Sequence, residues 1–377
     1  MKSEASDVLI VGGGIVGLTT AWKLAVQGVK VTLLDRRETG SEASWAGAGM
    51  LPPGTTSSPR TPESVLRCYS NQLWPGLSEQ LRVISGIDNG FRRCGAIQLF
   101  DETNADSLLP LTRNWTAEGI CHTQWNRDSL QQATSAVNPR FEQAVWLPDF
   151  CQVRNPRHLK SVRVACQQNG VSIVEHAATT DIVTDGRVVR AIRCGDQIFK
   201  ADRFCITAGA WTTLLLQTVG VTVPIRPVRG QIVQLRVSRL PFRCVIELGK
   251  RYLVPRPDGL ILVGSTEEDA GYVRENTAQG VADLLRFAAD LVPELKHASI
   301  VRMWSGLRPG TPDELPLLGT VPGFENLFVG AGHFRSGLQM SPATAQILAD
   351  LLLDRPLSCS LNGLQPDRFA ENSLCAQ

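Results

Sequence analysis

The sequence predicts an α/β fold in two parts, a parallel sheet flanked by helices and an α+β unit of mainly antiparallel sheet. Residues 8–34 follow a strand–helix–strand pattern with a glycine-rich turn after the first strand. Residues 201–211 and 327–332 are further apolar strands that run into small residues and glycine. Residues 221–264 instead form several β segments, including the alternating runs 228–237 and 250–255. A chain of 377 residues is long enough for both parts.

The N-terminal turn has the spacing of a Rossmann-like dinucleotide site. Gly12, Gly14 and Gly17 stand between the apolar strand Val8–Val11 and a helix predicted over residues 15–27. Gly12 allows the tight turn, Gly14 lets the backbone approach a pyrophosphate, and Gly17 lets the helix pack on the strand. The N-terminal N–H groups and positive dipole end of the helix would then face the phosphates.

An acidic residue follows the second strand, which is predicted over residues 30–34. Asp35 stands where a carboxylate can accept hydrogen bonds from a ribose. Arg36 and Arg37 raise the alternative of a ribose 2′-phosphate, as in NADP, but Asp35 would repel that phosphate. An ordinary βαβ turn without a ligand is the remaining alternative. Because strand, turn, helix and acid all have the expected spacing, we favour a nucleotide with a free ribose hydroxyl.

The composition excludes several classes of function. The net charge of +2 gives no reason to expect nucleic acid as a partner. No run approaches the roughly 20 apolar residues of a membrane span, and residues 1–7 are too short and polar for a signal peptide, so we expect a cytoplasmic protein. The ten cysteines form no Cys-x-x-Cys pair and the five histidines are scattered, so no metal centre is expected.

Periodicity and turn residues place the remaining elements. Helices are predicted over residues 62–86, 103–119, 157–169 and 276–291, and strands over 94–100, 171–175 and, as a hairpin, 180–192. The last helix is predicted over residues 342–353, with Ser341 as its N-cap and Pro342 in its first turn. Residues 41–53 are rich in small side chains. They form either a plain loop or, given their place after the ribose strand, a flat surface against a cofactor.

The motifs together resemble the FAD-dependent D-amino-acid oxidase family, and within it most resemble the glycine oxidases of thiamine biosynthesis. The resemblance covers nearly the whole chain. Beyond the N-terminal glycines it rests on residues 46–51, 207–211, 228–231, 252–256, 306–313 and 330–337. The last three of these segments are far more specific than the glycine turn, which many Rossmann-type proteins share.

The resemblance implies a glutathione-reductase-type FAD-binding domain and a substrate-binding domain whose sheet covers the flavin. It places residues 1–86, 150–220 and 298–377 in the first and 87–149 and 221–297 in the second. It also implies a homo-oligomer, often a homotetramer. No cysteine or histidine stands where a covalent flavin link is expected, so FAD should be bound noncovalently.

The same resemblance implies a set of FAD contacts, from the pyrophosphate turn to the pyrimidine end of the flavin. The last helix would direct its N-terminus at the flavin edge where charge accumulates on reduction. The expected cofactor residues are Gly12, Gly14, Ile15, Val16, Gly17, Asp35, Arg36, Ser44, Ala46, Gly47, Gly49, Met50, Thr179, Ala208, Gly209, Trp211, Gly332, His333, Phe334, Arg335, Ser336, Gly337 and Leu338.

The catalytic residues implied by the resemblance are Arg308, Tyr252 and Arg335. Arginine binds a carboxylate through two parallel hydrogen bonds, so Arg308 is expected to hold the substrate carboxylate. Tyr252 would add a hydroxyl donor and Arg335 would help to close the site, while His333 is expected to be structural. Met50 is expected beside the substrate.

Two positions depart from the glycine oxidase pattern. Glu267 stands where those enzymes have a methionine near the substrate, and Lys250 replaces a histidine. A charge in an apolar pocket is costly without a partner. We therefore expect Glu267, although substrate-adjacent, to be exposed or paired, with Lys250 as a partner within reach.

The function implied is oxidation of glycine, sarcosine or small D-amino acids by oxygen, yielding an oxo acid, ammonia and hydrogen peroxide. Two alternatives stay open at this stage. One is a dehydrogenase that passes its electrons to a quinone or another acceptor. The other is a noncatalytic nucleotide-binding protein, against which the pair Arg308 and Tyr252 argues, because a sensor needs no carboxylate clamp.

Overall fold

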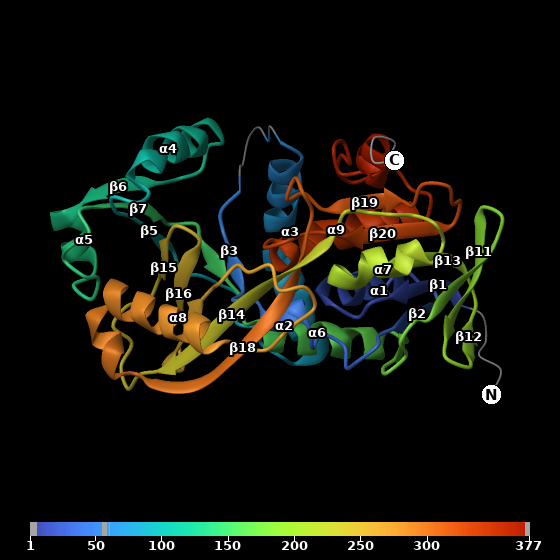
Figure 1. Ribbon diagram of the computed structural model, residues 1–377, viewed down its shortest axis with the longest axis horizontal. Coiled ribbons are helices and arrows are strands. Elements are labelled where there is room, and N and C mark those ends of the chain that lie inside the picture. Colours follow the sequence, from blue (N-terminus) through green and yellow to red (C-terminus); the bar gives the residue numbers. More distant parts are fainter. Residues whose placement is uncertain (1–5, 55–58, 60, 374–377) are drawn as a thin grey trace.

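The computed structural model describes residues 6–54, 59 and 61–373 of the chain. Two large sheets lie side by side (Figure 1). The first has six strands in the order β19 (Leu317–Thr320), β20 (Leu327–Ala331), β13 (Ala201–Ile206), β1 (Ser6–Val11), β2 (Val31–Leu34) and β9 (Ser172–Val174). Only β19 runs antiparallel. The sequence therefore correctly predicts a parallel sheet built from segments far apart in the chain.

The central strand β1 is buried on both faces. Val8 and Ile10 face a core formed with α1 (Ile15–Ala25), α3 (Pro62–Ser85), α6 (Asn155–Gln168) and α9 (Gly337–Leu352). Leu9 and Val11 face a second core, shared with the three-stranded sheet β10 (Asp181–Asp185), β11 (Val188–Cys194) and β12 (Gln197–Phe199). Side chains alternate across a strand, so the continuous apolar run of β1 fits burial between helices and a second sheet.

The second large sheet has eight strands and is antiparallel except where β15 (Val245–Leu248) pairs with β5 (Ala96–Phe100). Its strand order is β18 (Ser299–Gly310), β14 (Arg226–Arg236), β17 (Leu260–Gly264), β16 (Arg251–Pro255), β15, β5, β7 (Gln143–Leu147) and β6 (Thr123–Asn126). One face packs on α8 (Ala278–Leu291), and the other faces the six-stranded half of the molecule. Both faces are covered, so β14 and β16 are almost wholly buried.

Shorter elements complete the fold. A small sheet joins β3 (Met50–Leu51), β8 (Cys151–Gln152) and β4 (Arg92–Arg93) between the two halves. The other helices are α2 (Ala43–Ala46), α4 (Leu108–Ala117), α5 (Arg127–Ala133) and α7 (Thr212–Gln217), and the 3₁₀ turns are η1 (Ala105–Ser107), η2 (Gly209–Trp211), η3 (Pro293–His297) and η4 (Pro366–Ser373). The helix predicted over residues 103–119 is thus shorter, with a 3₁₀ turn before it.

The start of the last helix corrects a prediction. Helix α9 begins at Gly337, after the N-cap Ser336, and Pro342 lies inside it. Proline lacks the N–H that would bond to the carbonyl four residues earlier. The hydroxyl of Ser341 instead donates to the Leu338 carbonyl at 2.8 Å. This substitute bond lets the helix pass through Pro342, where the sequence predicts its start.

One strand lies just after the predicted domain boundary at residue 298. Strand β18, assigned by the sequence to the nucleotide-binding part, pairs with β14 from Arg226–Gly310 to Arg236–Ser299. It is therefore an edge strand of the eight-stranded sheet. This long pairing joins two segments that are far apart in the sequence. None of the helices in the described part of the chain is long and apolar enough to cross a membrane.

Candidate active site

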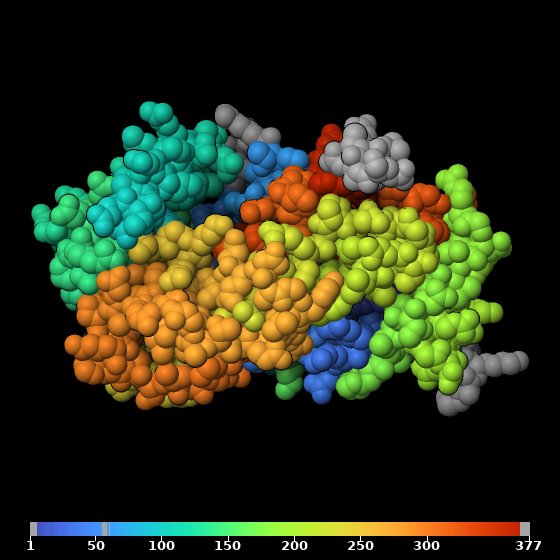
Figure 2. Space-filling model, viewed as in Figure 1, coloured from blue at the N-terminus to red at the C-terminus, as the bar shows by residue number. Residues whose placement is uncertain are grey.

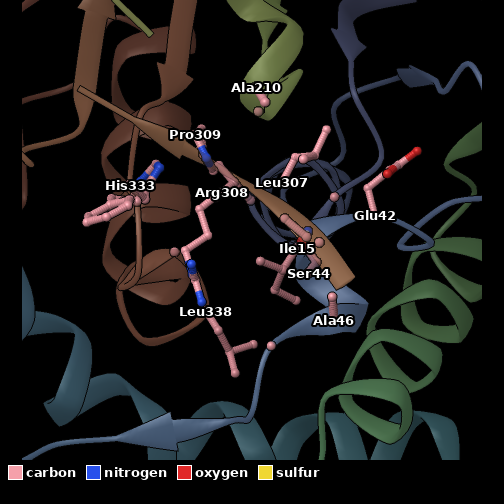
Figure 3. A pocket seen from close by; sticks show the side chains of 18 of the residues that line it. Ile15, Glu42, Ser44, Ala46, Ala210, Leu307, Arg308, Pro309, His333 and Leu338 are labelled. Atoms are coloured by element: carbon pink, nitrogen blue, oxygen red, sulfur yellow. The ribbon is translucent and has the colours of Figure 1, made fainter. Parts of the chain in front are cut away.

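A cavity of about 730 Å³ lies between the two large sheets. One end is formed by the turn after β1 and the tip of β2, and the other by residues of β16 and β18. Figure 3 shows Ile15, Ser44 and Ala46 around the same pocket as Arg308 and Leu338. The cavity thus lies at the carboxyl end of a parallel sheet, where open α/β folds bind ligands.

The glycines of the N-terminal turn differ in what surrounds each of them. Gly12 has a φ of +110°, and a Cβ there would lie 2.5 Å from the Thr207 carbonyl oxygen. A Cβ on Gly17 would lie 2.0 Å from the Gly12 carbonyl oxygen, so this glycine is required for close helix packing. A Cβ on Gly14 would meet only the Ser44 Oγ, at 3.2 Å. The backbone at Gly14 is therefore open toward the cavity, as a pyrophosphate path needs.

Helix α1 presents its N-terminus to this end of the cavity. Its N-cap is Gly14, which offers no capping side chain. The Ile15 N–H donates to the Ser44 Oγ at 2.9 Å, while Ile15 and Val16 both line the cavity. Free N–H groups in a first helical turn favour an anion. The turn and helix together fit the pyrophosphate of a dinucleotide.

Asp35 lies at the tip of β2 and is fixed by backbone hydrogen bonds. Its Oδ2 accepts from the Gly13 N–H at 2.7 Å, and its Oδ1 accepts from the Arg37 N–H at 2.8 Å. Burial raises the pKa of Asp35, and these two hydrogen bonds oppose the rise. A carboxylate oxygen can accept more than one hydrogen bond. Asp35 therefore fits contact with ribose hydroxyls.

Arg36 is engaged by neighbouring side chains at the same end of the cavity. Its guanidinium stacks 3.5 Å from the centre of the Trp211 ring and pairs with Glu42 at 2.8 Å. Glu42 also pairs with Arg274 at 2.7 Å. Because Arg36 already has a carboxylate partner, this arrangement favours a ribose without a 2′-phosphate.

The backbone of residues 46–50, where the flavin is expected, is held by buried polar side chains. The Asn155 Nδ2 donates to the Ser44 carbonyl at 2.8 Å, and the Arg256 Nη2 donates to the Ala48 carbonyl at 2.6 Å. A Cβ on Gly306 of β18 would lie 2.6 Å from the Ala46 Cβ. Sequence reasoning assigned no role to Asn155 or Arg256, although Arg256 belongs to the 252–256 motif.

The segment before α9 forms another wall, and His333 within it is structural, as predicted. The ring is buried and its Nε2 lies 3.0 Å from the Thr344 hydroxyl. Burial lowers the pKa of His333 to about 4, so this side chain is neutral at ordinary pH. The N-terminal residue of α9, Gly337, also lines the cavity, so the helix dipole is placed to act on a bound anion.

Arg308 on β18 is held in a defined orientation. Its Nη2 donates to the Ser265 Oγ at 2.6 Å and its Nη1 to the Thr266 carbonyl at 3.1 Å. The guanidinium lies directly over Gly230, where a Cβ would be 2.1 Å from Nη2. Burial lowers the pKa of Arg308, and Tyr252 counteracts part of that fall. Among the described residues, no carboxylate forms an ion pair with Arg308.

Tyr252 on β16 shares this end of the cavity. A Cβ on Gly264, the residue opposite it on β17, would lie 2.7 Å from the Tyr252 hydroxyl. Burial raises the pKa of Tyr252, while the Arg308 guanidinium and a hydrogen bond with Ser265 lower it. Sequence reasoning missed Ser265. Its only signal is its place directly after the glycine that ends β17.

Glu267 is paired, as expected, but it lies off the cavity wall. Its Oε1 accepts from the Lys250 Nζ at 3.0 Å, and its Oε2 pairs with Arg335. Lys250 and Arg335 line the cavity, whereas Glu267 does not. The Glu267 carboxylate is directed to two cations at the edge of the site.

Two predicted cofactor residues also lie off the wall. Gly17 packs α1 on β1, and a Cβ on Gly332, which has a φ of +79°, would lie 2.8 Å from the Thr311 Cγ2. Both are structural glycines beside the site. The other expected residues line the cavity: Gly12, Gly14, Ile15, Val16, Asp35, Arg36, Ser44, Ala46, Gly47, Gly49, Met50, Thr179, Ala208, Gly209, Trp211, Tyr252, Arg308, His333, Phe334, Arg335, Ser336, Gly337 and Leu338.

Comparison with known proteins agrees with this geometry. Residues 7–351 match a family model described as FAD-dependent oxidoreductase. The chain belongs to this FAD-dependent oxidoreductase family. The oxidoreductase is 35% identical over 350 residues to a glycine oxidase of Pseudomonas putida, covering 92% of this chain and 94% of the relative. The crystal structure of a glycine oxidase from Geobacillus kaustophilus superposes with a TM-score of 0.93 at 31% identity, covering 97% and 99% of the two chains.

A further relative, the bifunctional protein ThiO/ThiG of Synechocystis, is 33% identical over 373 residues. That match covers 97% of this oxidoreductase but 54% of the bifunctional protein. The oxidoreductase is thus an FAD enzyme of the glycine oxidase type. Among the described residues, no group of three or more His, Cys, Asp or Glu side chains could hold a metal ion.

Proposed function

We propose that this oxidoreductase oxidises glycine and other small amines or D-amino acids to an oxo acid, ammonia and hydrogen peroxide. The observation that carries the proposal is Arg308, a largely buried guanidinium with no carboxylate partner among the described residues. A desolvated, unpaired cation beside a tyrosine hydroxyl fits a substrate carboxylate through charge-assisted hydrogen bonds. The relatives named glycine oxidase support the choice of substrate.

The chain's own residues would bind and orient the substrate. Arg308 would grip the carboxylate, and Tyr252 would donate its hydroxyl to the same group. FAD, when bound, supplies the chemistry of accepting the two electrons and passing them to oxygen. Holding the carboxylate at a fixed place would restrict how the Cα–H bond is oriented within the cavity. We further propose that the product supplies thiazole synthesis, a role favoured by the ThiO/ThiG relatives.

The test is oxygen uptake and peroxide formation by the purified flavoprotein with glycine, sarcosine, D-alanine and D-proline. We expect one peroxide for each substrate molecule consumed. If substrate is consumed without oxygen uptake while an added quinone is reduced, the protein is a dehydrogenase and not the proposed oxidase. No consumption of any of the four substrates would overturn the proposal.

A further inference from the structure

Two acidic side chains of the cavity, Glu247 and Glu314, have no part in the site described above, and Glu314 is exposed. Glu247 on β15 lines the cavity, and burial is the only influence that moves its pKa, which rises to about 7. Within the described residues, its carboxylate has no hydrogen-bond or ion-pair partner. Glu247 is half-buried in the cavity wall. Carboxyl groups withdrawn from water are normally paired, so this one is available to a ligand.

The sheet places Glu247 beside Tyr252. The two residues are directly opposite each other in the antiparallel β15–β16 pair. Side chains of such a pair lie on the same face, with Cβ atoms about 5 Å apart. Glu247 therefore faces the cavity on the same side as the Tyr252 hydroxyl. The surface is hollowed beside the β15–β16 hairpin, next to the α4 segment (Figure 2).

Around Tyr252, the described residues supply no ion-pair partner for the cation Arg308 or for the anion Glu247. Lys250 and Arg335 share the single carboxylate of Glu267, so each of these two cations has an acidic partner. Arg308 bonds only to a hydroxyl and a carbonyl. Arg308 and Glu247 thus remain as opposite charges on either side of Tyr252, whose pKa both of them influence.

The distance between the Arg308 guanidinium and the Glu247 carboxylate is set by the strand order of the sheet. The Arg308 guanidinium lies over Gly230 of β14 and reaches Ser265, at the end of β17. Glu247 is on β15, two strands beyond β17. Adjacent strands are about 4.8 Å apart, so these two steps span about 10 Å. The amine of glycine, bonded to the carbon next to its carboxylate, cannot cover such a gap, whereas a side chain of three or four carbons ending in an amine can.

We propose that Glu247 forms an acidic subsite for a distal ammonium group, so that amino acids with a basic side chain are preferred substrates. The inference rests on the proposed function, since it assigns the substrate carboxylate to Arg308. It goes beyond that function by naming a substrate class and a specificity residue. A substrate whose side chain has the same length but ends in an apolar group would leave the Glu247 carboxylate unpaired.

The first test measures binding without oxidation. The probes are 5-aminopentanoate, which has a carboxylate and a distal amine but no α-amine, and pentanoate, which lacks the amine. Each is titrated into the holoenzyme while the flavin spectrum is followed. We expect 5-aminopentanoate to bind at least about tenfold more tightly, and Glu247→Gln to remove this preference. Equal binding of both probes by the native protein would overturn the inference, even if no amino acid is oxidised.

The second test uses the ratio of kcat/KM for D-ornithine to that for D-norvaline, because a ratio within one variant cancels general effects on catalysis. Glu247→Gln should lower it at least about tenfold. Glu142→Gln, which removes an exposed carboxylate outside the cavity, should leave it unchanged. If Glu247 instead held the α-amine, its replacement would slow both substrates equally, and the inference would fail while the proposed function stood.

The pH dependence of the D-ornithine to D-norvaline ratio gives a further test on the native protein. The residues on the elements beside Glu247 are Tyr252 on β16, Lys250 in the hairpin turn and the uncharged Gln98 on β5. Because burial raises the pKa of Glu247 to about 7, its charged fraction grows between pH 6 and pH 8. The D-ornithine to D-norvaline ratio should rise over that interval, and a flat ratio would contradict the assignment.

Discussion

Replacement of Arg308 by alanine is the most direct probe of the substrate end of the cavity. The variant loses the guanidinium and leaves the Ser265 hydroxyl and the Thr266 carbonyl without their donor. Truncating one partner of a hydrogen-bonded charge pair costs about 2–5 kcal/mol. Arg308 is half-buried as a whole residue, and Tyr252, which lines the same cavity, would still donate to the carboxylate in the variant, so we take the lower part of that range. The expected loss in kcat/KM for glycine is about 30-fold to 400-fold.

The assay is steady-state peroxide formation, with the flavin-to-protein absorbance ratio measured on every variant. Arg308→Lys should lose less, because it keeps the charge but not the two parallel donors. Arg226→Ala is the matched control, since Arg226 is exposed on the neighbouring strand β14 and pairs with Asp269 outside the cavity. A native kcat/KM in an Arg308→Ala protein that retains its FAD would refute the carboxylate-clamp reasoning.

Three further predictions concern single residues around the cavity. Gly230→Ala should raise KM at least about tenfold at normal flavin content, because its methyl would lie 2.1 Å from the Arg308 Nη2; an unchanged KM would show that the guanidinium does not need this place. Gly14→Val should abolish FAD retention, because its side chain enters the open pyrophosphate path, and a normal flavin-to-protein ratio after purification would contradict the phosphate-turn assignment. Glu247→Gln should raise Tm at pH 8 but not near pH 4.5. Burial raises the folded-state pKa of Glu247 to about 7, so the folded protein holds this proton more tightly than the unfolded chain does. The stability that results is fully present below the unfolded pKa and is lost as pH rises through about 7. An equal Tm difference at both pH values would count against this.

The sequence allows detailed predictions for the nucleotide half of the site because the roles proposed there depend on local geometry. The roles of Gly12, Gly14 and Gly17 follow from the backbone conformation and packing of one short turn, and Asp35 from its place at a strand end. Arg308 was found through its flanking motif and the resemblance it carries. In each case the signal is contained in a few neighbouring residues.

The substrate half could not be predicted in the same detail, because strands distant in sequence meet there. Gly230 matters only because β14 pairs with β18 and brings it under Arg308. Glu247 lies in the cavity only through the register of the β15–β16 hairpin, and no local pattern singles it out. The assignment of β18 to the eight-stranded sheet likewise depends on its pairing with β14.

By itself, therefore, the sequence determined the α/β class, the dinucleotide turn and the arginine expected to bind a carboxylate. Only the tertiary structure decided that Glu267 pairs with Lys250 and Arg335 off the cavity wall, and that Glu247 lies in the cavity with no partner among the described residues. The physical reason is that the charge state and partners of a buried side chain depend on every element packed around it. A residue's chemical type is written in the chain, but its neighbours are set by the pairing of strands far apart along it.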